Sequence, residues 1–284
     1  MAVVLTCVLL LATSVLATLG AVVAESALGI RPSGIPTGGM TPVLLVANSV
    51  GLGLLIPCAL AAAKLVGRPA RYLHSVTGRF RWSLLWRASG VVGLVLGAWF
   101  IAGLLIDGIP ELRVASYSWM LLVALMLVTP FQAAGEEYLT RGVINRAIAT
   151  WVPWRRGGLI VGAVVSSLMF TALHNAGDVW LNLVYFLMGL VLCHVTWRTG
   201  GLEAAVALHT VNNMLSFVFV PFQDLDQVFA RQSGAADWTV LIQLTFIGVA
   251  AVIIEVVARR RGVATTAPVA AAQTTAGGVT IVEG

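Results

Sequence analysis

Long apolar runs are the feature that most constrains how this chain can fold. A bilayer core of ~30 Å takes ~20 consecutive helical residues to cross, and runs of about that length recur along the whole sequence. The sequence therefore predicts an all-α, polytopic membrane protein with about eight transmembrane helices. We expect them near residues 2–24, 41–64, 88–107, 117–145, 158–175, 178–198, 201–221 and 238–258.

The composition agrees with this prediction. Hydrophobic residues make up 59% of the chain and charged residues only 10%, whereas a soluble domain is about 25% charged. The first run resembles a signal peptide ending near Ala24. However, no basic residue precedes it, and its apolar stretch exceeds the usual ~7–15 residues. We expect it to remain as a membrane helix.

Basic residues follow a pattern that predicts topology. The formal net charge of +5 would suggest nucleic-acid binding in a soluble protein, but here the charges flank the apolar runs. We therefore expect no nucleic-acid partner. With the N-terminus in the cytoplasm, the other side carries Arg31, Arg113 and Arg231, and an even number of spans with both termini cytoplasmic satisfies the positive-inside rule. The cytoplasmic side would carry Lys64, Arg68, Arg71, Arg79, Arg81, Arg87, Arg146, Arg155, Arg156, Arg198, Arg259, Arg260 and Arg261.

We expect one transmembrane domain over residues 1–260 and a disordered tail over 261–284, which is rich in Ala, Thr, Val and Gly. The basic and aromatic segment 68–87 has two open interpretations. It lies on the inner leaflet, or it is a loop that serves only to fix topology. Two Gly pairs spaced four apart predict close helix packing. They are Gly93 with Gly97 and Gly158 with Gly162.

An unusual polar stretch, Glu136 to Arg141, continues the fourth apolar run. Each charge at mid-bilayer costs roughly 2.5–3.5 kcal/mol, so it needs a partner or a function. Residues four apart share a helix face, so Glu137 can pair with Arg141. Glu136 then lies on another face, beside Thr140 and Gln132. The alternative is that the helix ends near Gly135 and both glutamates are solvated.

Two further pairs, each containing one histidine, favour the interpretation that the glutamates are buried. Phe170 and His174 lie four apart in the fifth run, and His209 and Asn213 lie four apart in the seventh. If the fourth helix continues to Thr150, then Glu136 lies ~21 Å from the inner end of that helix. His174 lies ~24 Å from the inner end of the fifth helix, near Gly158, so the two residues would be at a similar depth. This geometry requires the long helix, which we expect to bend at Pro130.

The three motifs in this order resemble the CPBP family of intramembrane proteases, also called Abi, which includes the type II CAAX prenyl endopeptidases and bacteriocin-immunity homologues. The motif core spans residues 117–221. The resemblance implies an eight-helix fold and a peptidase that acts on a membrane-associated protein or peptide in the lipid bilayer. By motif position, Glu136 and His174 would activate water, and His209 with Asn213 would stabilise the oxyanion. Glu137, Arg141 and Phe170 would support the site.

Cofactor use has two interpretations. The family has also been described as metalloproteases, and Glu136, Glu137, His174 and His209 offer zinc two His and a carboxylate. The H-E-x-x-H zinc helix is absent from the sequence. We favour a glutamate-activated water without metal, with zinc as the alternative.

Two other functions are open at this stage. A non-catalytic immunity or scaffolding protein of the same fold would bind partners through its helices. A small transporter would use buried Glu and His as a relay, although no repeated half is visible in the sequence. The substrate and the oligomeric state are not specified by these patterns.

Overall fold

The computed structural model describes residues 2–27 and 39–267. Within these ranges the regular structure is helical, and the β-type pairing is an isolated bridge between Ser75 and Gly201. The predicted all-α class is confirmed. The helices are α1 (Ala2–Ala27), α2 (Pro42–Gly53), α3 (Leu55–Leu65), η1 (Ala70–Leu73), α4 (Trp82–Asp107), α5 (Ser118–Glu137), η2 (Tyr138–Asn145), α6 (Arg146–Ala149), α7 (Arg155–His174), α8 (Val179–Thr199), α9 (Glu203–Phe217), η3 (Val220–Phe222), α10 (Leu225–Val228) and α11 (Val240–Arg260).

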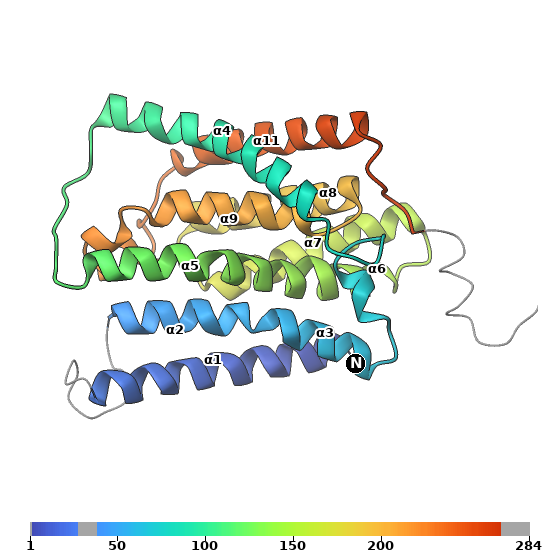
Figure 1. The fold of residues 1–284 in the computed structure, drawn as a ribbon, viewed down its shortest axis with the longest axis horizontal. Coiled ribbons are helices and arrows are strands. Elements are labelled where there is room, and N and C mark those ends of the chain that lie inside the picture. Colours follow the sequence, from blue (N-terminus) through green and yellow to red (C-terminus); the bar gives the residue numbers. More distant parts are fainter. Residues whose placement is uncertain (1, 28–38, 268–284) are drawn as a thin grey trace, which may run out of the picture.

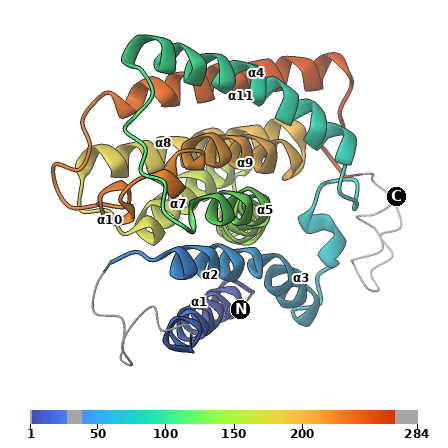
Figure 2. The same ribbon diagram turned by 60° about the vertical axis from the view of Figure 1, so that its left-hand side comes forward.

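The long helices run up and down the bundle in three layers. Helices α5, α7, α8 and α9 form the middle layer, with α4 and α11 on one side and α1 to α3 on the other (Figures 1 and 2). The largest apolar core joins α4, α8, α9 and α11 through buried side chains such as Val92, Leu192, Leu208 and Ile247. The middle layer is therefore covered by protein on two sides.

Seven helical segments in the described chain are long and apolar enough to cross a membrane. The eighth expected run is α1, whose described apolar part, Leu11–Ala27, is shorter than a full span. Helix α1 itself has 26 residues and lies alongside α2 (Figure 1). The chain is a multi-pass membrane protein.

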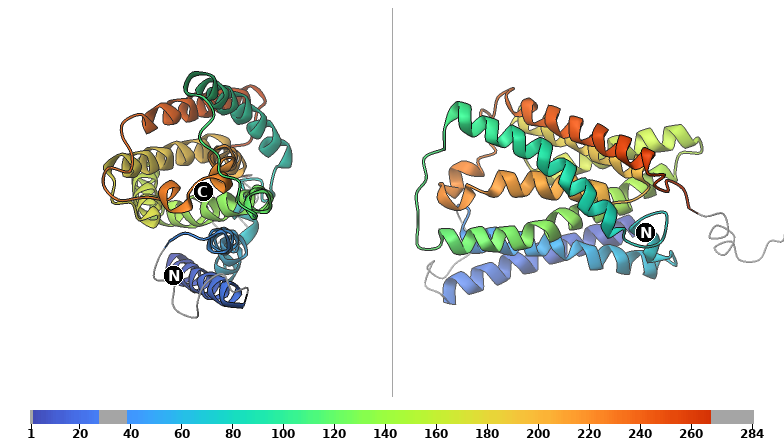
Figure 3. Two further views of the ribbon diagram at one scale, coloured as in Figure 1. Left: turned by 90° about the vertical axis from the view of Figure 1, so that its left-hand side faces the viewer. Right: turned by 45° about the horizontal axis from the view of Figure 1, so that its top comes forward.

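The basic residues gather at one end of the bundle, which we call the basic end. It is formed by the end of α3, the start of α4, the α6–α7 turn and the ends of α8 and α11 (Figures 1 and 3). Helix α1 begins and α11 finishes at this end. Arg113 and Arg231 precede α5 and α11, at the opposite end, while Arg31 lies outside the described residues. The charge asymmetry seen in the sequence thus maps onto the two ends of the bundle.

One expectation about glycine packing is confirmed and one is wrong. Side chains at Gly158 and Gly162 would collide with the backbone of α6 and of the segment before it, so these glycines permit close helix contact. Side chains at Gly93 and Gly97 would meet nothing within 4 Å. Helix α4 turns that face away from the protein, and spacing alone does not reveal which face a helix buries.

Helix α4 begins at Trp82, six residues before the expected start at residue 88. In the structure Arg87 and the exposed Trp82 and Trp86 lie within the first turns of the helix. Such residues suit the interfacial end of a spanning helix, where long side chains reach the headgroups.

The segment before α4 is docked on the protein, an arrangement that neither interpretation of residues 68–87 included. Val76 donates to the Gly200 carbonyl and Leu202 donates to the His74 carbonyl. The Arg81 guanidinium forms a bidentate ion pair with buried Glu203 at 2.7 and 2.9 Å. This segment therefore fixes the start of α9, the helix that carries His209.

The first residues of the expected tail are part of the described chain. The carbonyl of Ala264 accepts a hydrogen bond from Arg81 at 3.2 Å. Most of the tail, residues 268–284, lies outside the described residues.

Candidate functional site

The glutamates lie inside one long helical run from Ser118 to Ala149. The long helix required by the depth argument is therefore present, and the alternative that it ends near Gly135 is wrong. From Tyr138 to Asn145 the run is a π-helix. Such segments are rare and often occur at functional sites. Ser166 of α7 donates to the Thr140 carbonyl at 2.9 Å, which satisfies a backbone group in the π-helical turn.

Arg141 is held by a set of buried contacts. Its guanidinium donates to Glu137 at 3.0 Å, to the Thr140 hydroxyl at 2.7 Å and to the Gly189 carbonyl of α8 at 3.1 Å. It also lies 4.6 Å from the centre of the Phe170 ring. The predicted Glu137–Arg141 ion pair is present, and its side chains are fully buried. The hydrogen bonds to Thr140 and Gly189 offset part of the cost of burying the paired charges.

His209 of α9 lies between the two glutamates. Its Nδ1 is 2.8 Å from Glu137 Oε1, and its Nε2 is 3.8 Å from Glu136 Oε2. Because an ionised Glu137 accepts hydrogen bonds, Nδ1 carries the hydrogen in this pair, which leaves Nε2 facing Glu136. The ion pair on α5 and η2 thus orients the histidine of α9.

Glu136 is the more accessible glutamate, with a side chain 12% exposed while that of Glu137 is 0% exposed. Gln132, one turn earlier, donates to Glu136 Oε1 at 2.5 Å. The Gln132 carbonyl oxygen in turn lies 3.5 Å from the Asn213 amide nitrogen. The sequence placed Gln132 beside Glu136, and this is confirmed. The chain of contacts brings Asn213 to the same group.

His174, the last residue of α7, lies at the edge of this group. Its Nδ1 is 2.7 Å from the Phe170 carbonyl, and its ring stacks on Tyr185 of α8 with 4.0 Å between centroids. Among the described residues no hydrogen bond joins Glu136 and His174, and their joint role in activating water stays a prediction. The histidine beside Glu136 is His209, with Nε2 3.8 Å from Glu136 Oε2. Phe170 contacts both histidine rings.

Three further residues support the site without having been predicted. Tyr185 stacks on His174 and accepts a hydrogen bond from Arg231. Gln243 of α11 donates to Asn212 at 2.8 Å, and Asn212 donates to Asn213 at 3.2 Å. Polar residues in apolar helices were the available signal for Gln243 and Asn212. Their partners lie on other helices, which spacing within one helix does not identify.

The four residues proposed as zinc ligands do not converge in the way that a metal site requires. In the part of the chain that the structure describes, no group of three or more His, Cys, Asp and Glu side chains is placed to hold one ion. His209 Nδ1 faces Glu137, and His174 Nδ1 faces a backbone carbonyl. The metal-free reaction stays a prediction.

The other two histidines, His74 and His194, have contacts outside the Glu136 group. His74 lies against the Tyr138 hydroxyl, and burial lowers the pKa of His74, opposed by the charge of Glu203. His194 lies 2.7 Å from Glu255 on the outer helix α11.

The arrangement has the parts of an acid–base site. A partly accessible carboxylate, Glu136, lies beside His209 Nε2 and, through Gln132, beside the Asn213 amide. A carboxylate can accept a proton from water, and amide and imidazole N–H groups can stabilise a developing negative charge in a low-dielectric environment.

Comparison with known proteins identifies a family segment. Residues 115–215 match the family described as "Type II CAAX prenyl endopeptidase Rce1-like". This range contains all seven predicted site residues, from Glu136 to Asn213.

The curated relatives are similar over part of their length. The chain is 28% identical to "Uncharacterized protein YyaK" of Bacillus subtilis (strain 168) over 155 residues, which cover 49% of this chain and 50% of the relative. It is 35% identical to "Uncharacterized 24.3 kDa protein" of Escherichia coli over 103 residues, which cover 34% of this chain and 45% of the relative. The chain thus spans about half the length of these relatives.

No solved structure matches the chain. The order of the motifs, the helical fold and the family match agree with one another. The family match covers the segment 115–215, which carries the whole candidate site and the motifs that resemble this family.

Proposed function

We propose that this protein is an intramembrane endopeptidase that hydrolyses a peptide bond of a membrane-associated protein or peptide. The observation that carries the proposal is the division of roles between adjacent glutamates. Glu137 is fully buried and bonded to both Arg141 and His209, whereas Glu136 is partly exposed and lies beside His209 Nε2. One carboxylate builds the site, and the other is available to water.

In the proposed reaction Glu136 takes a proton from water, and the water oxygen attacks the carbonyl carbon of the peptide bond. The oxyanion that forms accepts a hydrogen bond from the Asn213 amide and one from His209, whose Nε2 carries a proton in this step in addition to the Nδ1–H held by Glu137. The proton on Glu136 passes to the amide nitrogen as the C–N bond breaks, which releases a carboxylic acid and an amine. His174, at the edge of the group, helps Glu136 to activate the water.

The supporting residues act by holding these groups in place. Gln132 donates to Glu136 and contacts Asn213, so it keeps the base and the oxyanion donor at a fixed separation. Glu137 fixes the orientation of His209. Preorganised donors of this kind need no rearrangement when charge develops.

We also propose that the basic end faces the cytoplasm, which would place both termini there. The proposal is supported by the concentration of Lys and Arg at this end. Reporter fusions after Arg261 test it. A cytoplasmic reading is expected, and a reading from the opposite side of the membrane would overturn the orientation.

Comparative analysis of protein termini in cell membranes tests the activity. Cells with the wild-type protein should contain at least one new protein terminus that is missing in cells with the Glu136→Gln variant at equal abundance. Identical sets of termini in the two membranes would favour the non-catalytic scaffolding or immunity function.

A further inference from the structure

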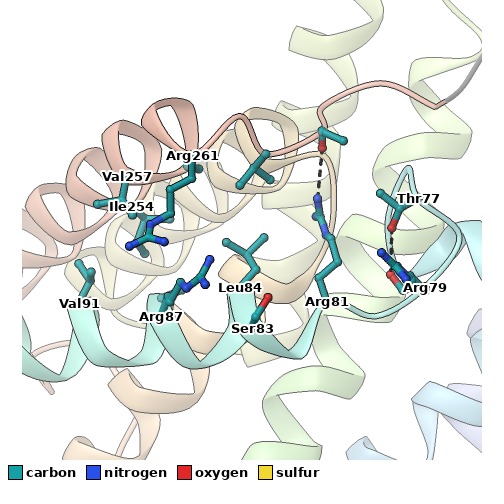
Figure 4. Close-up of a pocket in the computed structure, with 14 residues that line it drawn as sticks. Thr77, Arg79, Arg81, Ser83, Leu84, Arg87, Val91, Ile254, Val257 and Arg261 are labelled. Carbon is teal, nitrogen blue, oxygen red and sulfur yellow. Dashed lines mark hydrogen bonds between the residues drawn. The ribbon is translucent and has the colours of Figure 1, made fainter.

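A second site candidate lies at the basic end, between α4 and α11. It is a pocket of about 220 Å³ whose walls come from the first turns of α4, the end of α11, the segment before α4 and residues 263–264. Figure 4 shows Arg87 on α4 and Arg261 after α11, which extend into the space between the helices from opposite walls. The pocket shares no lining residue with the Glu136 site.

Positive charge dominates this pocket. Four arginines line it, and no Asp or Glu is among the lining residues. Arg81 is paired with Glu203 behind the pocket wall. Arg87 and Arg261 are both exposed, and neither has an acidic partner among the described residues. Two facing cations repel each other, more strongly near a membrane than in water, and a bound anion would relieve this repulsion.

The rest of the lining is apolar. Val91, Ile254 and Val257 form the wall that continues from the arginines toward the middle of the bundle (Figure 4). Close by on α4, Trp82 and Trp86 are 62% and 67% exposed, as is typical of rings at the headgroup level of a bilayer. The pocket therefore presents cations at headgroup depth and hydrocarbon next to them.

We propose that this pocket binds the phosphate group of an anionic phospholipid of the surrounding leaflet. Arg87 and Arg261 hold the phosphate oxygens, and one acyl chain lies along Val91 and Ile254. Guanidinium groups bind phosphate through paired hydrogen bonds, and basic pockets between transmembrane helices are suited to lipid headgroups. The site is independent of the proposed peptidase activity.

Lipid titration of the full chain in neutral detergent tests the proposal, with native mass spectrometry and thermal unfolding as readouts. Phosphatidylglycerol should bind with one-to-one stoichiometry and raise the unfolding midpoint more than phosphatidylcholine does. The double variant Arg87→Gln/Arg261→Gln should bind phosphatidylglycerol roughly 10- to 30-fold more weakly. Equal binding of the two lipids by the wild-type protein would overturn the site.

The matched control is Arg155→Gln/Arg156→Gln, which removes the same charge from exposed positions at the start of α7. It should keep wild-type binding. If it loses as much affinity as the pocket variant, general surface charge explains the binding and the pocket is not the site. Inorganic phosphate is the second arm. If it stabilises the protein as well as the lipid does at equal concentration, a free anion is the ligand and the lipid proposal is wrong.

A second variant keeps the test valid if the double variant folds poorly. Ser83→Glu places a carboxylate at the pocket, where it supplies the missing counter-charge, and the first turn of a helix tolerates an acidic residue. This variant should fold normally and lose selectivity for phosphatidylglycerol. A folded Ser83→Glu protein that binds the lipid as the wild type does would contradict the proposal.

Discussion

Helices α4 and α9 differ in a way that sequence hydrophobicity would not suggest. The α4 segment is the more apolar of the two, yet only 11% of its most apolar 18-residue stretch is buried within the protein. The segment that begins with α9, Glu203–Phe222, is less apolar, and 50% of its most apolar 18-residue stretch is buried. In a membrane, lipid accommodates apolar side chains as well as protein does, so hydrophobicity does not drive a helix into the interior.

Small and polar residues explain the position of α9. Ala204, Ala205 and Ala207 are buried and let neighbouring helices approach closely, while His209 and Glu203 make buried polar contacts. Helix α4 lacks such contacts along its outer face and presents large apolar side chains to lipid. The comparison suggests that the interior of this protein is assembled around its polar site.

The largest expected effect on stability comes from the centre of that interior. Removal of one partner of a buried ion pair costs ~3–5 kcal/mol because the other charge is left unpaired. Arg141→Ala should therefore lower both the folded yield in detergent and the thermal unfolding midpoint. Arg155→Ala, at an exposed position, is the control and should leave both unchanged. Equal stability of the two variants would break the proposed link between polar contacts and the packing of the interior.

A matched pair of substitutions tests small-residue packing. Ala205→Leu in α9 overfills a fully buried position and should cost ~1–3 kcal/mol. Ala102→Leu makes the same change on the exposed face of α4 and should have little effect on thermal stability. If both variants unfold at the same temperature in detergent or nanodiscs, then burial does not distinguish the two helices.

The smallest expected effect lies at a helix end outside the spans. Asp178 caps α8 by accepting from the Leu181 and Trp180 amides, and its other oxygen accepts from Gly234. The Leu181 hydrogen bond, opposed by burial and reinforced by Gly234 and Trp180, holds the pKa of Asp178 below its usual range.

The sign of the pH effect follows from this shift. The unfolded chain takes up a proton at a higher pH than the folded protein does, so the stabilisation by Asp178 is present at neutral pH and is lost as the pH falls below about 4. The difference in unfolding midpoint between the wild type and Asp178→Asn should shrink between pH 7 and pH ~3.5. If the difference in unfolding midpoint does not depend on pH, then the charge of Asp178 does not contribute to the stability of the protein.

Much of the fold could be predicted because it depends on features local in the sequence. Apolar length set the spans, and a separation of four residues identified the Glu137–Arg141 pair. The π-helix could not be predicted, since its altered hydrogen-bond register depends on partners such as Ser166 from another helix. The approach of His209 to Glu136 likewise depends on how α9 packs against α5.

The central claim is that Glu136, beside His209 and Asn213, is the base of a peptide hydrolase. The most direct measurement is the rate of cleavage of a membrane-associated peptide by purified protein and by Glu136→Gln, which keeps the size of the side chain but cannot accept the proton. Exposed Glu111→Gln is the control. The rate should fall ~10²–10⁴-fold in Glu136→Gln only, and extensive chelation should leave wild-type cleavage intact. Wild-type cleavage by Glu136→Gln would contradict the assigned base, and loss of activity on chelation with recovery in zinc would contradict the metal-free reaction.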